Sequence, residues 1–161
     1  MDKKLIHLTA DVTLDVPLER AWEVVALGFG DVAQYNPAIA ASEFTSEQRA
    51  GVGTGRLCHV APKGFLKEQI TRWENQRFFE LEVVDTSFPM HTVTSRFSFT
   101  PLGERTRVKQ DFWYRMKPPM GWLSGLMKKP MQKTLDEGLN GLAHYLDHGE
   151  KLTPSLPSSM Q

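Results

Sequence analysis

The N-terminal segment alternates strictly between hydrophobic and polar residues. Apolar side chains occupy every second position from Ile6 to Val16, with polar residues such as His7 and Asp11 between them. A period of two is typical of a β-strand with one buried and one solvated face. We therefore predict a half-buried strand over this segment.

The segment after this strand has the spacing of one or two short helices. Pro17 suits a first helical position, where a backbone N–H would have no intrahelical partner. The apolar residues that follow at helical spacing are Ala21, Trp22, Val25 and Ala26. Gly28, Gly30 and then Asn36-Pro37 predict the ends of these helices.

Residues 39–115 return to a period of two, and turn residues interrupt it every 8–14 positions. Several strands in a row with short connections predict an antiparallel meander. Three strands have clear apolar faces: Phe79, Leu81 and Val83; Val93, Ser95, Phe97 and Phe99; Val108, Gln110, Phe112 and Tyr114. The strands near 55–61 and 65–73 carry mixed residues on both faces, so their register stays open.

The C-terminal region changes to a helical period. Leucine and methionine recur every three or four residues, at Leu123, Met127, Met131, Leu135, Leu139, Leu142 and Leu146. This spacing predicts one long amphipathic helix that ends near His148-Gly149, with a kink or a broken first turn at Pro130. We predict a single domain over residues 1–149 and a disordered tail rich in Ser and Pro over residues 150–161.

Composition narrows the class of protein. The chain has 161 residues, 19 basic and 19 acidic side chains and no net charge, which argues against a nucleic-acid binder that depends on a basic surface. Its single cysteine, Cys58, cannot form an intramolecular disulfide. No apolar run approaches the ~18–20 residues of a membrane span, and the N-terminus does not resemble a signal peptide. We expect a cytoplasmic protein.

Motifs with a defined chemistry are weak. The glycines of residues 51–55 are followed by a strand pattern and lack the helix that a phosphate site requires. His144 and His148 stand four apart, but no further residue has the spacing of a metal ligand, so we expect neither metal nor cofactor. Lys128, Lys129 and Lys133 form a small basic face that could touch an anionic membrane or ligand; we interpret it as a solvated helix face.

Two polar residues interrupt the apolar face of the meander. Ser95 and Gln110 stand among aromatic and aliphatic neighbours on strands that otherwise alternate cleanly. An unpaired amide in a dry core costs roughly 1–3 kcal/mol. Either these two groups pair with each other, or they line a space that holds water or a ligand.

Several segments together resemble a known superfamily. These are DVPLERAWEVV, NPAI, GVGTGRL, TVTSRFSFTP, GERTRVKQDFWY and the aliphatic terminal helix. They are similar to the START/Bet v 1-like (SRPBCC) superfamily, in particular its polyketide cyclase/dehydrase-like branch, over about residues 5–148. The resemblance implies an α+β helix-grip fold, in which a bent antiparallel sheet of about seven strands wraps around the C-terminal helix. It also implies a deep apolar cavity for lipid-, polyketide- or quinone-like molecules.

The resemblance also implies which side chains line the cavity. These are Arg56, Cys58, Glu68, Leu81, Val83, Val93, Ser95, Gln110, Phe112, Tyr114, Met127 and Met131. Arg56 and Glu68 either form an ion pair inside the cavity or lie on the outer face as surface charges. Tyr114 either donates a hydrogen bond or a proton to a ligand, or is a core tyrosine with its hydroxyl at the rim.

Three hypotheses of function follow. The first is a carrier of a hydrophobic small molecule, as a monomer or homodimer. The second is a cyclase or dehydratase in which Tyr114, Arg56 and Glu68 converge on one point of the cavity. The third is a protein-interaction or chaperone-regulating module, which a cavity packed shut by Phe97, Phe99 and Phe112 would favour.

Overall fold

The computed structural model describes residues 5–152, which form one curled sheet and a set of helices. Seven antiparallel strands follow the order β1-β7-β6-β5-β4-β3-β2, as the meander predicted, and β1 joins the far edge beside β7. The strands are β1 (Ile6–Leu14), β2 (Ile39–Phe44), β3 (Gly55–Val60), β4 (Phe65–Glu74), β5 (Phe78–Thr86), β6 (Met90–Leu102) and β7 (Arg105–Met116).

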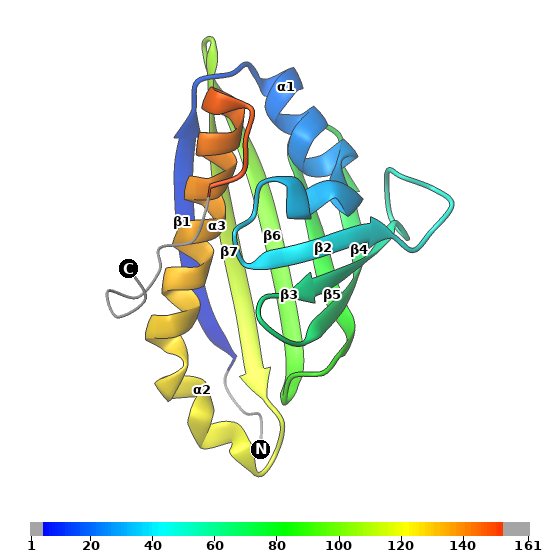
Figure 1. Cartoon of the computed structure of the whole chain (residues 1–161), viewed down its shortest axis with the longest axis vertical. Coiled ribbons are helices and arrows are strands. Elements are labelled where there is room, and N and C mark those ends of the chain that lie inside the picture. Colours follow the sequence, from blue (N-terminus) through cyan, green and yellow to red (C-terminus); the bar gives the residue numbers. More distant parts are fainter. Residues whose placement is uncertain (1–4, 153–161) are drawn as a thin grey trace.

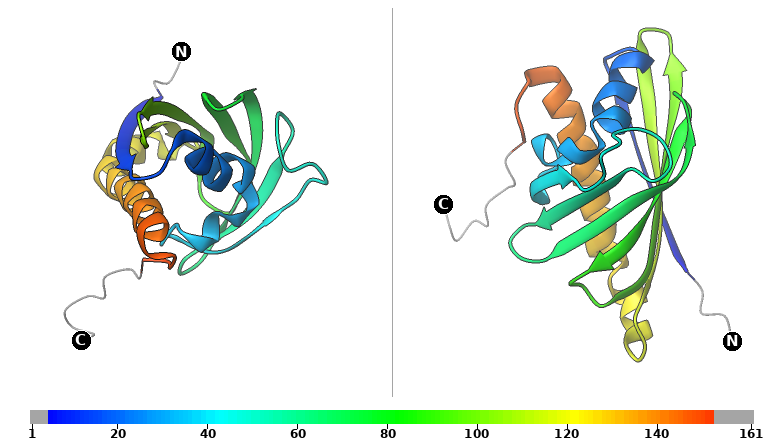
Figure 2. Two further views of the ribbon diagram at one scale, coloured as in Figure 1. Left: turned by 90° about the horizontal axis from the view of Figure 1, so that it is seen from above. Right: turned by 90° about the vertical axis from the view of Figure 1, so that its right-hand side faces the viewer.

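The helices lie on the concave side of this sheet (Figures 1 and 2). They are α1 (Leu18–Trp22), the π-helical turn η1 (Glu23–Leu27), the 3-10 helix η2 (Phe29–Gln34), η3 (Met120–Trp122), α2 (Leu123–Leu126) and α3 (Lys128–His148). The long helix α3 packs along β1, and η2 packs on β2 and β3. The predicted helix-grip architecture is confirmed: the sheet wraps around the C-terminal helix.

Proline residues set where the helices begin and break. Pro17 lies one position before α1, in extended backbone, and its carbonyl accepts the N–H groups of Arg20 and Ala21 at 3.1 Å. Pro130 has no N–H for the carbonyl of Leu126, which is where α2 ends. The predicted broken first turn is therefore confirmed, and α3 continues to His148 and a left-handed Gly149 (φ +72°).

The first residues of the predicted tail, 150–152, belong to the part of the chain that the structure describes. The Lys151 ammonium donates a hydrogen bond to the carbonyl oxygen of Ile39 at 2.7 Å, so the chain just after α3 contacts the start of β2. The remainder of the predicted tail, residues 153–161, lies outside the described residues, and its disorder stays a prediction.

A register shift explains the mixed faces of β4. Leu66, Glu68 and Ile70 point to the concave side, but the pairing with β5 shifts between Ile70 and Arg72, so that Trp73 takes the next inward position. One extra residue in a ladder reverses the parity of every side chain after it. A strict alternation therefore cannot be found along this strand.

An aromatic cluster fills one end of the space between the helices and the sheet. Trp22 of α1 meets Trp73 and Phe99 edge-on, with ring centroids 4.9 and 5.0 Å away. Trp22, Phe29 and Phe79 are at most 2% exposed. Edge-to-face packing of these large rings fills this end of the fold with hydrophobic core. A cavity can therefore lie only along the rest of the concave face.

Candidate functional site

A cavity of about 480 Å³ lies between the concave face of the sheet and α3. Its walls come from β2–β7, from η1, η2 and the loop after η2, and from the inner face of the C-terminal helices. Most of the lining side chains are apolar. The sequence-predicted residues on this wall are Arg56, Cys58, Glu68, Leu81, Val83, Val93, Ser95, Gln110, Phe112, Met127 and Met131.

Tyr114 is the predicted residue that does not line the cavity. Its side chain is fully buried, packs against Phe112, and donates its hydroxyl hydrogen bond to the carbonyl oxygen of Ser124 in α2. Of the two alternatives predicted for it, the core tyrosine holds, with its hydroxyl bonded to a backbone carbonyl oxygen. The tyrosine ties the end of β7 to the start of the C-terminal helices, because a buried hydroxyl needs a partner.

The larger of two polar sites on the cavity wall is a buried ion pair. Arg56 and Glu68 are direct cross-strand partners on β3 and β4, so both face inward. Arg56 Nε donates to Glu68 Oε1 at 2.9 Å, and the two residues are 7% and 8% exposed. The alternative of two surface charges is excluded, and the ion-pair alternative holds.

The backbone and ring of Phe29 hold the guanidinium from the other side. Arg56 Nη1 donates to the Phe29 carbonyl oxygen at 2.9 Å, and its Cζ lies 4.0 Å from the centroid of the Phe29 ring. Burial lowers the pKa of Arg56, but Glu68 and the neighbouring Cys58 and Tyr35 more than offset that effect, so its pKa is raised. The guanidinium is thus held between Glu68 on one side and Phe29 on the other.

Cys58 completes this cluster from β3. Its thiol Sγ lies 3.5 Å from Glu68 Oε1 and donates a weak hydrogen bond to it. Burial raises the pKa of the thiol to about 12. Cys58 is therefore a buried neutral group and not a reactive nucleophile.

Tyr35 is a cavity residue that the sequence analysis missed. It follows η2, lines the cavity close to the pair, and burial raises its pKa to about 12. Within residues 5–152 its hydroxyl has no hydrogen-bond partner. The only sequence signal was an aromatic residue just before Asn36-Pro37, which marks a helix end and says nothing about the direction of the ring.

Ser95 and Gln110 form a second, smaller polar site on the wall. Gln110 Nε2 donates to Ser95 Oγ at 3.0 Å, across β6 and β7. Both residues also line the cavity. The two alternatives predicted for them therefore hold together: they pair with each other, and they border open space.

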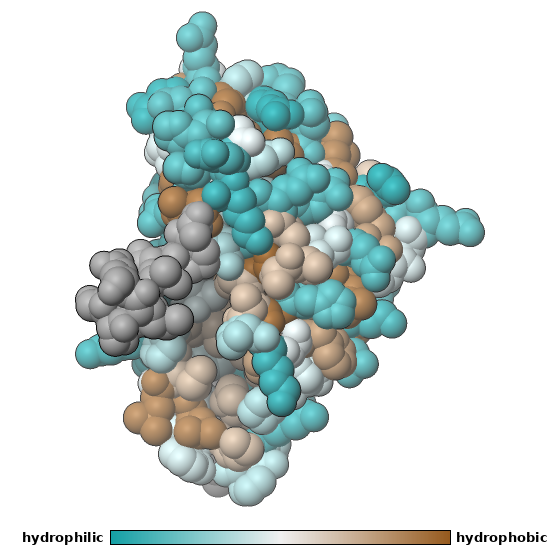
Figure 3. All heavy atoms as spheres, in the orientation of Figure 1, coloured by the Kyte–Doolittle hydropathy of each residue, from teal (hydrophilic) through white to brown (hydrophobic). Residues whose placement is uncertain are grey.

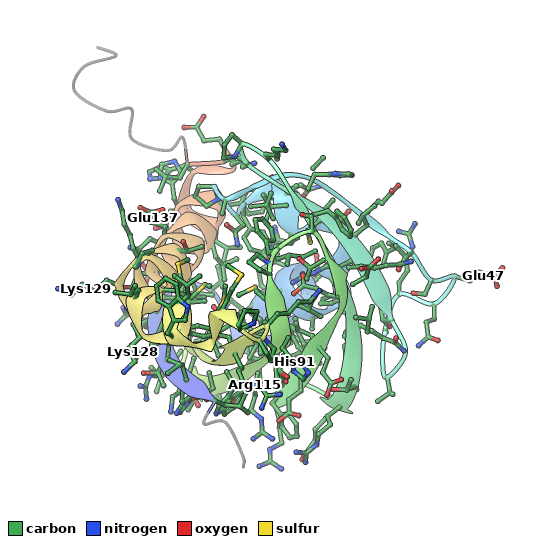
Figure 4. All side chains as sticks on the ribbon, turned by 90° about the horizontal axis from the view of Figure 1, so that it is seen from below. Glu47, His91, Arg115, Lys128, Lys129 and Glu137 are labelled. Atoms are coloured by element: carbon green, nitrogen blue, oxygen red, sulfur yellow. The ribbon has the colours of Figure 1, made fainter. Side chains whose placement is uncertain are left out.

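The rim of the cavity comes from elements far apart in the sequence. The hairpin between β5 and β6 contributes Phe88, Pro89 and Met90, and the facing helices contribute Leu123 and exposed Thr134. Viewed from below in Figure 4, these elements surround the space between the helix and the strands. The glycine-rich segment of residues 51–55 projects elsewhere, and none of it lies on the cavity wall.

Sequence comparison places the chain in a family. It belongs to the polyketide cyclase / dehydrase and lipid transport family, whose model matches residues 6–147. This match confirms the membership that the motifs predicted. No protein of curated function matches the sequence.

Solved structures of the same fold agree with this assignment. A START superfamily protein from Mycobacterium smegmatis superposes with a TM-score of 0.75 at 17% identity, over 88% of this chain and 97% of that one. The protein TTHA0849 from Thermus thermophilus gives 0.73 at 20% identity, covering 89% and 99%. Ara h 8.0201 gives 0.70 at 11% identity, covering 89% and 98%. At such identities the likeness shows the shared fold.

Proposed function

We propose that this protein binds a hydrophobic small molecule, lipid-, polyketide- or quinone-like, in the cavity between the sheet and α3. The observation that carries the proposal is an open apolar space with one fixed polar cluster. Its volume of about 480 Å³ falls within the ~300–1,000 Å³ range of small-molecule sites. Each 100 Å² of apolar ligand surface that leaves water contributes about 2.5 kcal/mol before the costs of association.

The polar cluster selects a neutral polar group on the ligand. Glu68 already compensates the charge of Arg56, so a carboxylate there would be desolvated without gaining a free cation. The available donor is the Tyr35 hydroxyl, which suits a carbonyl or hydroxyl oxygen. The guest then lies with its polar end at the cluster and its apolar part along the wall that includes Met127 and Met131.

The geometry favours binding over the two alternative functions. The enzymatic alternative needed Tyr114 beside Arg56 and Glu68, and Tyr114 lies elsewhere. With pKa values of about 12, neither Tyr35 nor Cys58 is matched to proton transfer near neutral pH. The interaction module was favoured by a cavity packed shut with Phe97, Phe99 and Phe112. Phe97 and Phe112 border open space, and Phe99 packs on Trp22.

Native mass spectrometry of protein from its own host tests the proposal directly. A retained lipid-like mass is the expected result. Binding is then measured with the neutral probe N-phenyl-1-naphthylamine and by competition between dodecanol and dodecanoate. Dodecanol should compete better, because its head group carries no charge.

A matched pair of tryptophan variants locates the site. Met131→Trp adds a large ring to the cavity wall and should weaken probe binding at least about tenfold. Val84→Trp adds the same ring on the exposed side of β5, where Val84 is 54% exposed, and should leave binding unchanged. Equal binding by both variants, with circular dichroism showing both folded, would refute the proposed site.

A further inference from the structure

Two large apolar side chains lie exposed where η3 meets the short helix α2: Trp122 ends η3, and Leu126 ends α2. Trp122 is 69% exposed and Leu126 is 66% exposed, more than any other large apolar side chain in residues 5–152. They are four residues apart, so they share one helical face. Figure 3 shows hydrophobic atoms at the surface over α2. Single exposed apolar residues are ordinary, but an adjacent tryptophan and leucine need an explanation.

Basic side chains follow immediately. Lys128 and Lys129 begin α3, and Figure 4 shows both pointing away from the sheet beside α2. Residues 112–135 contain no Asp or Glu, although the whole chain is neutral. Lys117 contributes less, because it shares a small surface hollow with Asp85. We name Trp122, Leu126, Lys128 and Lys129 the α2 patch.

Residues 122–131 alternate between the cavity side and the solvent side of the C-terminal helices. Leu123, Met127 and Met131 line the cavity, while Trp122 and Leu126 point outward. The N–H of Met127 bonds to Leu123 O, and the N–H of Met131 bonds to Met127 O, both at 2.9 Å, so the helical path continues across the break. The α2 patch is therefore the outer surface of the same wall that borders the cavity rim.

We propose that the α2 patch docks on an anionic lipid bilayer. Tryptophan and leucine enter the boundary between head groups and acyl chains, where an amphipathic indole ring is favoured. Lys128 and Lys129 face the anionic head groups, and each basic residue at such a surface contributes about fivefold in affinity. The structure thus changes the interpretation of the lysines: exposed apolar neighbours make them one side of an interfacial site and not only a solvated face. The docking goes beyond the proposed function and does not depend on an occupied cavity.

Vesicle flotation tests the docking. The full-length protein is mixed with vesicles of phosphatidylcholine with about 30 mol% phosphatidylglycerol, and with vesicles of phosphatidylcholine alone. We expect binding to the first that falls steeply with added salt, together with a blue shift of tryptophan fluorescence. Absence of binding, or equal binding to neutral vesicles, would overturn the proposal.

Two variants and two matched controls assign the surface. Lys128→Glu/Lys129→Glu should weaken vesicle binding at least about 25-fold, and Trp122→Ser/Leu126→Ser should abolish it. Two controls carry the same kinds of change away from the α2 patch. Lys109→Glu reverses a charge on the outer face of β7. Leu102→Ser removes an apolar side chain that is 48% exposed at the C-terminal end of β6. Both controls should bind like the wild-type protein.

The outcomes separate this proposal from the previous one. The patch variants should keep wild-type binding of N-phenyl-1-naphthylamine in solution, because Trp122 and Leu126 do not line the cavity. Patch variants that bind vesicles as well as the controls do would refute the docking. A wild-type dimer in size-exclusion chromatography that Trp122→Ser/Leu126→Ser converts to a monomer would assign the patch to self-association and also refute it.

Discussion

Replacing Glu68 by glutamine removes one charge from the buried pair while keeping the shape of the side chain. Arg56 would then retain the carbonyl oxygen and the ring of Phe29 but lose its only carboxylate contact in the part of the chain that the structure describes. The Arg56 side chain is only 9% exposed, so its guanidinium cannot recover this loss from water. We expect Glu68→Gln to be strongly destabilising.

The magnitude follows from the geometry of the pair. At 2.9 Å and an effective dielectric constant of about 20, the attraction between the two charges is about 6 kcal/mol before desolvation is counted. Breaking one side of such a buried pair typically costs about 3–5 kcal/mol. The contacts to Phe29 favour the lower end, about 3 kcal/mol, which corresponds to a fall of about 6–12 °C in melting temperature for a chain of this size.

Urea unfolding of a double-mutant cycle measures the effect. Arg56→Met/Glu68→Leu should recover most of the lost stability, because it removes both charges together. Asp11→Asn is the control: Arg107 and Asp11 lie 2.8 Å apart, but their side chains are 48% and 52% exposed. That exposed pair should contribute less than about 1 kcal/mol. Two outcomes would show that burial does not strengthen this pair. One is that the changes in the free energy of unfolding caused by the Arg56 and Glu68 substitutions simply add. The other is that Glu68→Gln lowers the free energy of unfolding no more than Asp11→Asn does.

Further predictions concern single side chains. Burial raises the pKa of Cys58 from 9.0 to about 12, so as the pH rises the thiol of the unfolded chain ionises before that of the folded chain. The contribution of Cys58 to the free energy of unfolding should therefore be present in full below pH 9. It should fall by up to about 4 kcal/mol as the pH rises toward 12. Cys58→Val should flatten this fall in urea titrations, although Tyr35 adds its own loss between pH 10 and 12. Gly141→Ala should destabilise by about 1–3 kcal/mol, since its Cβ would lie 2.5 Å from the carbonyl oxygen of Tyr35. A Cβ at Gly125 would meet nothing within 4 Å, so Gly125→Ala should increase the free energy of unfolding by about 0.5–1 kcal/mol and raise the melting temperature. Tyr114→Phe should cost about 1 kcal/mol and leave binding of the naphthylamine probe unchanged.

Much of the architecture followed from local patterns. The alternation of β1, the helical spacing of α3 and the turn residues between them depend on contacts within a few residues, so their signals survive in the sequence. The break at Pro130 is of the same kind, because the missing N–H acts on the carbonyl four residues earlier. The cavity wall was predictable where a strand alternated cleanly, as on β6.

The site was less predictable where direction depended on pairing. Glu68 lies on a strand whose register shifts, so its inward position became certain only through its partner Arg56 on β3. Tyr114 has the inward parity of its strand, yet α2 covers that end of the sheet and takes its hydroxyl. Tyr35 comes from a loop without periodicity, and only the packing of η2 on the sheet brings its ring to the cavity.

The amino-acid sequence by itself determined the order of elements, the apolar faces of the clean strands and the neutral charge balance, because each of these is a local or summed property. The tertiary structure decided which polar groups meet: it joined Arg56 and Glu68 in one buried pair, and it left Trp122 and Leu126 outside beside two lysines. Such contacts depend on strand register and helix docking. Those are relations between distant segments, which no local pattern contains.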